Sequence, residues 1–183
     1  DTATGKMDMT VGNGLRTESL TKTVSGSNVT ETRTETDGSS NVSSVTRENK
    51  FQFPFGLNVV DHILDPAGAA LTTHYTYYED SVNDGGAYGQ VKTMVEPSGR
   101  WTSYTYDSQG RPADTVTQFL NSVICTPASQ IRVTSTTWST VTDLDGDGLP
   151  ETLSTTVDSL LGQETGRSFE LIYSTPQLFN AQP

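Results

Sequence analysis

The feature that most constrains this chain is a strand-and-turn unit that occurs more than once. The clearest copy spans residues 99–112, Gly-Arg-Trp-Thr-Ser-Tyr-Thr-Tyr-Asp-Ser-Gln-Gly-Arg-Pro. Tyr104 and Tyr106 are expected on one face of a strand, because successive strand side chains point to opposite sides. Asp107 begins an Asp-x-x-Gly turn, in which its carboxylate bonds nearby backbone and Gly110 supplies a positive φ. We therefore expect one strand to end here and another to begin.

Related turns recur along the chain with a common spacing. Asp65-Pro-Ala-Gly68 is followed by Tyr75-Thr-Tyr77, just as Glu96-Pro-Ser-Gly99 is followed by Tyr104-Thr-Tyr106. The two turns are 31 positions apart (65 to 96), and Thr126-Pro-Ala-Ser129 falls where a third turn is expected. A period of this size is typical of stacked supersecondary units that bury a shared core.

The run Tyr104-Thr-Tyr-Asp-Ser-Gln-Gly-Arg111 resembles the YD repeat of the RHS and teneurin family. The likeness covers one full motif and two or three partial ones, within residues 60–175. It implies β-hairpins that wind into a long sheet, often closed as a hollow shell, in a large secreted or surface-displayed protein. It also implies that the repeats are scaffold and that other chemistry lies in flanking domains. The residues that match the motif are Tyr75, Tyr77, Gly99, Tyr104, Tyr106, Asp107, Gly110 and Arg111.

Composition predicts an all-β fold built from repeated antiparallel hairpins in an extended or curled sheet. The chain has 30 threonines among 183 residues, and β-branched side chains fit a pleated sheet. No stretch shows the 3.6-residue apolar period of an amphipathic helix. We expect residues 1–58 to form Thr-rich strands, and residues 59–183 to form degenerate hairpin repeats.

The charge and composition of the chain limit the classes of partner and the location that we expect for it. A net charge of −11 argues against nucleic acid, whose phosphates require clustered Lys and Arg. No apolar run is long enough for a membrane span, and Lys-poor, Thr-rich, acidic composition favours an extracellular or cell-surface location. The single Cys125 is interpreted as a buried hydrophobe. Because the sequence starts at Asp1, we interpret it as a processed chain or an excised fragment.

Two N-terminal segments carry patterns of their own. Residues 27–37 alternate strictly, with threonines on one face and mostly charged residues on the other. Since neither face is apolar, burial cannot fix the register of this strand, and we expect a neighbouring strand to hold it. Another copy of the chain is one candidate for that neighbour.

Phe51, Phe53 and Phe55 precede Gly56 and predict a hydrophobic plug for the sheet, with a binding groove as the alternative.

An acidic loop is the one segment with a metal-binding pattern. Its spacing places carboxylates at positions 1, 3, 5 and 9, a backbone carbonyl at position 7 and a glycine at position 6, which are Ca²⁺-ligand spacings. Position 12 is Ser154 rather than glutamate, so the loop resembles the calcium loops of FG-GAP and related β-repeat proteins. A solvated hairpin turn is the alternative. The expected Ca²⁺ ligands are Asp143, Asp145, Asp147, Leu149 and Glu151.

No catalytic residues are assigned. His62 and His74 have no nucleophile near them in sequence, and two histidines with one cysteine are too few for zinc. Asp65 and the following proline match one half of the self-cleavage motif of RHS proteins, but a Pro-containing turn explains them. Asn28 and Asn41 fit the glycosylation sequon, which is a weak signal in a chain rich in Ser and Thr.

These observations favour a non-enzymatic, extracellular β-repeat module that serves as a calcium-stabilised scaffold. Its partners are expected to be copies of itself or flanking domains of a larger protein. The alternative is a calcium-dependent adhesion or glycan-binding domain. That alternative requires exposed aromatic rings beside the acidic loop, and the rings considered for it are Trp101, Trp138, Tyr88 and Phe55. An autoproteolytic segment is a third hypothesis.

Overall fold

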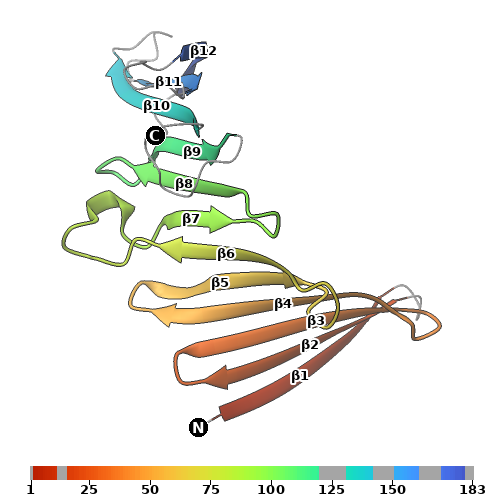
Figure 1. The fold of residues 1–183 in the computed structure, drawn as a ribbon. Coiled ribbons are helices and arrows are strands. Elements are labelled where there is room, and N and C mark those ends of the chain that lie inside the picture. Colours follow the sequence, from red (N-terminus) through yellow and green to blue (C-terminus); the bar gives the residue numbers. More distant parts are fainter. Residues whose placement is uncertain (1, 12–15, 120–130, 142–150, 161–169, 180–183) are drawn as a thin grey trace.

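A computed structural model describes the chain except for residues 1, 12–15, 120–130, 142–150, 161–169 and 180–183. The described residues form one open sheet of 12 strands, whose order in space is the order in sequence, from β1 to β12. Every neighbouring pair is antiparallel, so the sheet is a continuous meander of hairpins (Figure 1). The predicted all-β fold of repeated hairpins is confirmed.

Strand length changes along the sheet. The N-terminal strands are long: β1 (Thr2–Val11), β2 (Arg16–Ser25), β3 (Asn28–Asp37), β4 (Val42–Phe53) and β5 (Gly56–Leu64). The central strands are shorter: β6 (Leu71–Tyr77), β7 (Val91–Val95), β8 (Trp101–Tyr106) and β9 (Pro112–Gln118). Long strands return at the C-terminal end: β10 (Ile131–Val141), β11 (Glu151–Leu160) and β12 (Glu170–Phe179). β5 runs across residues 58 and 59, so the sheet is continuous where we expected two regions to meet.

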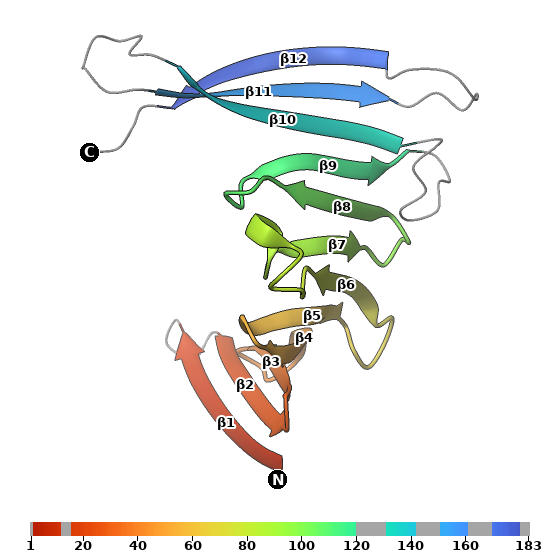
Figure 2. The same ribbon diagram turned by 90° about the vertical axis from the view of Figure 1, so that its left-hand side faces the viewer.

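The sheet is a single twisted layer, and the successive strands can be followed from one end to the other in Figure 2. Its apolar core is accordingly small. Trp101 is only 4% exposed and packs with Ile131 and Val133, while Val95 and Val116 complete the cluster. This cluster joins the short central strands to β10. No helix in the described part of the chain is long and apolar enough to cross a membrane.

The strand predicted at 27–37 is β3, and the neighbours that hold it are β2 and β4 of the same chain. Asp84 and the two glycines after it have a sequence typical of a tight hairpin turn, but the loop between β6 and β7 is too long for one and contains a 3-10 helix at Gly85–Ala87. One predicted strand end also needs correction. Phe55 lies in the turn between β4 and β5 rather than in the strand.

The phenylalanines nevertheless form the predicted plug. Phe53 is buried and stacks on Phe55, with ring centroids 4.8 Å apart and planes 7° from parallel. Tyr77 lies 5.3 Å from Phe53, and Tyr88 meets Phe55 edge-on at 5.2 Å. Aromatic pairs at such separations stabilise a core beyond their buried area. The cluster therefore covers the sheet where the β4–β5 turn meets the loop between β6 and β7.

Candidate functional site

The turn at residues 107–111 has the geometry that its sequence predicts. Its backbone closes through the Asp107 N–H and the Arg111 carbonyl oxygen at 2.9 Å, and through the Gly110 N–H and the Asp107 carbonyl oxygen at 3.0 Å. The Asp107 carboxylate accepts bonds from the backbone N–H of Gln109 and Arg111, both at 2.9 Å, and from Arg111 Nε at 2.7 Å. Gly110 has φ +79°, which favours glycine.

The hydrogen bonds of the turn lower the pKa of the Asp107 carboxylate. Desolvation acts to raise the pKa of Asp107, but the bonds from Arg111 and Gln109 outweigh it, and the pKa lies below its ordinary value. The guanidinium of Arg111 also lies 5.0 Å from the centre of the Trp138 ring in β10, and Trp138 Nε1 donates to the Pro112 carbonyl at 2.9 Å. The motif arginine thus links its own turn to the next hairpin.

Two other turns share this backbone pattern. At 96–100 the Glu96 N–H donates to the Arg100 carbonyl at 2.7 Å, and Gly99 has φ +81°. At 37–41 the Asp37 N–H donates to the Asn41 carbonyl at 2.9 Å, and Ser40 takes the left-handed position with φ +65°. Sequence reasoning left this last turn unassigned, because serine replaces the expected glycine. The Asp at its first position was the signal that identifies it.

The turn that begins at Asp65 is longer than the others. The Ala70 N–H donates to the Asp65 carbonyl at 2.8 Å, and both residues have φ +49°. The Asp65 carboxylate accepts the N–H of Gly68 at 3.1 Å and of Ala69 at 3.0 Å. These contacts give Asp65 a turn-forming role.

The tyrosines repeat a contact between strands. The hydroxyl of Tyr77 in β6 donates to the Val59 carbonyl of β5 at 2.6 Å, and that of Tyr106 in β8 donates to the Val91 carbonyl of β7 at 3.0 Å. In each Tyr-Thr-Tyr copy, the second tyrosine therefore anchors its strand to the preceding one. Partial burial raises the pKa of both hydroxyls, which keeps them protonated as donors.

Replacing Tyr106 by phenylalanine is expected to lower the free energy of unfolding by about 1 kcal/mol, because the ring stays in place and one hydrogen bond is lost. Tyr77→Phe is the matched variant in the other copy and should show a loss of similar size. Urea denaturation followed by far-ultraviolet circular dichroism measures both. Unchanged stability in both variants would show that this repeated contact has no structural role.

One face of the long strands carries a ladder of ion pairs, which we call the charge ladder. Glu31 on β3 accepts from Lys22 on β2 at 3.2 Å and from Lys50 on β4 at 2.5 Å. Lys50 also contacts Glu48 at 2.9 Å, and Glu48 lies 3.6 Å from Nδ1 of His62 on β5. Lys22 lies directly opposite Glu31, whereas Glu31 lies opposite Glu48, and Lys50 contacts both of these carboxylates. Ion pairs that join neighbouring strands in this way favour one register over its neighbours.

The opposite face has a ladder of uncharged and acidic groups. Thr30 on β3 donates to Asn49 on β4 at 3.4 Å, and the Asn49 amide donates to Asp61 on β5 at 3.1 Å. Asp61 in turn lies 2.7 Å from Nδ1 of His74 on β6. Both ladders were missed in the sequence, because the alternation of residues 27–37 does not indicate which residues of the other strands lie opposite them.

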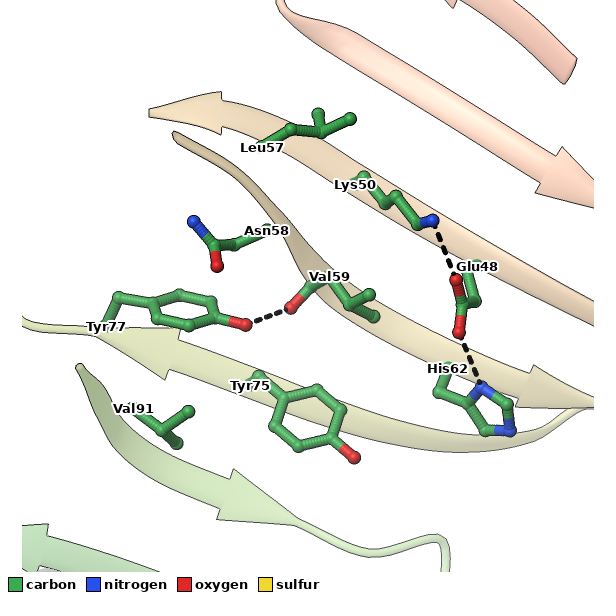
Figure 3. A pocket seen from close by; sticks show the side chains of 9 residues that line it. All are labelled: Glu48, Lys50, Leu57, Asn58, Val59, His62, Tyr75, Tyr77 and Val91. Atoms are coloured by element: carbon green, nitrogen blue, oxygen red, sulfur yellow. Dashed lines mark hydrogen bonds and ion pairs between the residues drawn. The ribbon is translucent and has the colours of Figure 1, made fainter. Parts of the chain in front are cut away.

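A shallow groove of about 400 Å³ lies beside the charge ladder, and Figure 3 shows its lining. The Tyr77 hydroxyl points to the Val59 carbonyl, and Glu48 lies between Lys50 and His62 (Figure 3). Both Glu48 oxygens are thus engaged in contacts with neighbouring side chains. The remaining lining residues are Leu57, Asn58, Tyr75 and Val91.

The predicted calcium loop falls largely outside the described residues. Asp143, Asp145, Asp147 and Leu149 belong to the segment 142–150, and Glu151 is the first residue of β11. β10 and β11 pair up to Val141 opposite Glu151, so the acidic segment joins two strands of one hairpin, as expected. Among the described residues, no three His, Cys, Asp or Glu side chains cluster in a way that could hold a metal ion.

The aromatic residues considered for ligand binding are engaged within the protein. Trp101 is part of the buried core. Phe55 and Tyr88 contact each other in the aromatic plug, and Trp138 contacts Arg111. The predicted turn at Thr126 lies outside the described residues.

Comparison with known proteins gives no match: no family model, curated protein or solved structure is similar to this chain at a significant level. The likeness to YD repeats therefore stays a prediction from the motif.

Proposed function

We propose that this chain is a structural β-repeat module, related to YD repeats, which serves as a scaffold rather than as an enzyme. The observation that carries the proposal is the sequential order of the 12 strands, in which, among the described residues, each strand pairs only with its neighbours in sequence. Such one-dimensional arrays extend by adding hairpins, and their stability is a sum of local terms. The residues of the chain would then serve chiefly to maintain the shape of the sheet.

The side-chain contacts support the same proposal. The chemistry of the turn, with Asp107 bonded to Arg111, and the repeated tyrosine anchors serve to close and align hairpins. The charge ladder does the same for the long strands. The carboxylate of Glu48 contacts Lys50 on its own strand and His62 on β5, and that of Asp61 contacts Asn49 on β4 and His74 on β6, so both acids serve to hold strands together.

An extracellular or cell-surface location fits this role, and we propose that the partners are further copies of the chain or flanking domains. Electron microscopy of the native material tests this part of the proposal. Shells, fibres or rod-like surface structures that contain the chain would support a scaffold. A freely diffusing, strictly monomeric species at all concentrations, with a measurable turnover of any substrate, would contradict it.

We further propose that Ca²⁺ binds the acidic loop and stiffens the β10–β11 hairpin. At a Ca²⁺ concentration of about 100 times the dissociation constant, binding adds about 2.7 kcal/mol to stability, which raises the melting temperature by roughly 5–10 °C. Melting curves with Ca²⁺ and with a chelator measure the shift. The double variant Asp145→Asn, Asp147→Asn is the control and should lose it. No shift in the unmodified chain would rule out the ion.

A further inference from the structure

The joint between β7 and β8 has the shortest backbone ladder in the described part of the sheet. It consists of three residue pairs and ends at Thr93 opposite Ser103, whereas the β2–β3 ladder has ten pairs. The ladders on either side of it, β6–β7 and β8–β9, are longer. In a one-dimensional array each interface between neighbours contributes its own term to stability. The β7–β8 joint therefore depends more than the long-stranded joints on contacts outside its ladder.

The two ends of this joint are closed in different ways. At one end, next to the turn that connects the strands, Val95 packs against the buried cluster of Trp101. At the other end the ladder stops at Thr93, although β7 begins at Val91 and β8 continues to Tyr106. There the Tyr106 hydroxyl donates to the Val91 carbonyl at 3.0 Å. Beyond Thr93, this side chain and the neighbouring loop take the place of the ladder.

That loop, residues 78–90, leaves β6 and lies beside the β8–β9 turn before it enters β7 (Figure 1). The Tyr78 hydroxyl donates to the Tyr104 carbonyl of β8 at 2.9 Å. At Gly86 an added Cβ would lie 2.4 Å from the Asp107 carbonyl oxygen, so the backbone of the loop rests directly on the backbone of the turn. The loop thus connects β6 to β8 by contacts that do not use the ladders of β7.

Hydrogen bonds within the loop brace it. The Asp80 carboxylate accepts the backbone N–H of Asn83 at 3.1 Å, and the Asp80 N–H donates to the Asp84 carboxylate at 2.8 Å. At the base of the loop, the Tyr78 N–H donates to the Gln90 carbonyl at 3.0 Å. Because the loop is braced in this way, we expect it to move as one body, so that its contacts with β8 and the turn form and break together.

We propose that the 78–90 loop is a latch on the β7–β8 joint. Seated on the 107–111 turn, it keeps the short ladder closed; when it lifts, the sheet opens between β7 and β8 while the flanking ladders stay paired. Such an opening is a local excursion from the folded state, with a free energy below that of global unfolding. The latch does not depend on the proposed scaffold role. In a scaffold it would set how firmly the two blocks of long strands are joined.

Native-state hydrogen exchange on the full chain, followed by nuclear magnetic resonance, tests the latch with two tyrosine variants. Tyr78→Phe removes the hydroxyl bond to β8 and keeps the ring. The amides that β7 and β8 donate to each other should then exchange about fivefold faster, which is the usual effect of losing one hydrogen bond. Tyr77→Phe is the matched control, because its hydroxyl bond joins β6 to β5 and stays intact when the latch lifts. It should leave the exchange of those amides unchanged.

Equal effects of the two variants would overturn the proposal. If both accelerate the β7–β8 amides to the same extent, these amides exchange through unfolding of the whole sheet rather than through a local opening. If neither does, the loop does not hold the joint closed.

The unmodified chain gives a second readout, which decides the matter even if a variant fails to fold. Exchange of the β7–β8 amides should change little when urea is added at low concentration, since a local opening exposes little surface. Exchange of the β2–β3 amides should respond more steeply, because opening the long ladders exposes more of the sheet. The same urea dependence at both joints would contradict a joint that opens locally.

Discussion

Replacing Gly86 by alanine is expected to lower the free energy of unfolding by about 1–3 kcal/mol, because a side chain there overfills a packed contact. An added Cβ would lie 2.4 Å from the Asp107 carbonyl oxygen and 2.6 Å from the Gly110 nitrogen. Both atoms belong to the backbone of the 107–111 turn, which cannot move without breaking its own hydrogen bonds. The loop between β6 and β7 and the β8–β9 turn are thereby locked together.

Gly5→Ala is the matched control, since a Cβ at that position in β1 meets no atom within 4 Å. It should leave stability unchanged or raise it slightly, because alanine restricts the unfolded chain more than glycine does. Urea denaturation of the two variants side by side measures the difference. Equal stability of Gly86→Ala and the unmodified chain would mean that the loop does not pack on the turn.

The substitution Arg132→Met is expected to lower the free energy of unfolding by about 3 kcal/mol, because it removes a cation that pairs with a buried carboxylate. Asp158 on β11 is only 1% exposed, and it accepts hydrogen bonds from Arg132 and Thr134 on β10. Met keeps the aliphatic bulk of the arginine, so the loss reports on charge. Thermal and urea unfolding at neutral pH provide the measurement.

A second substitution separates charge from packing at this position. Adding Asp158→Asn to Arg132→Met should recover part of the loss, since a neutral amide is easier to bury than a carboxylate that has lost its arginine partner. Arg33→Met, which removes an exposed partner of Glu18, is the comparison and should cost no more than about 1 kcal/mol. If Arg132→Met were as mild as Arg33→Met, the buried pair would contribute little to the β10–β11 hairpin.

Local sequence patterns predicted the turns well, because turn chemistry acts within five residues. Asp107 with Gly110, and Glu96 with Gly99, form the turns that their sequences indicate. The all-β class followed from threonine content and alternation. The strands that pair with residues 27–37 were predicted less well, since alternating Glu and Arg indicate a strand but not which strand lies beside it. The structure supplies that neighbour from the same chain on both sides.

Contacts between residues that are distant in sequence could not be predicted from local patterns. The close approach of Gly86 to Gly110 depends on how a loop folds back on a turn, and nothing in the spacing of the two glycines indicates it. Asp158 resembles any other acid in a Thr-rich strand, and only the register of β10 with β11 shows that it faces Thr134. The same holds for His74 and Asp61, which lie 13 positions apart in sequence.

The arrangement of strands is the claim on which the proposed scaffold role depends, and nuclear magnetic resonance tests it directly. Cross-strand nuclear Overhauser effects on the full chain should connect Lys22 with Glu31, Glu31 with Glu48, and Glu48 with His62, which are paired residues of neighbouring strands from β2 to β5. Each strand should show such contacts only to its neighbours in sequence. A register shifted by one residue, or contacts between strands that are distant in sequence, would contradict this arrangement.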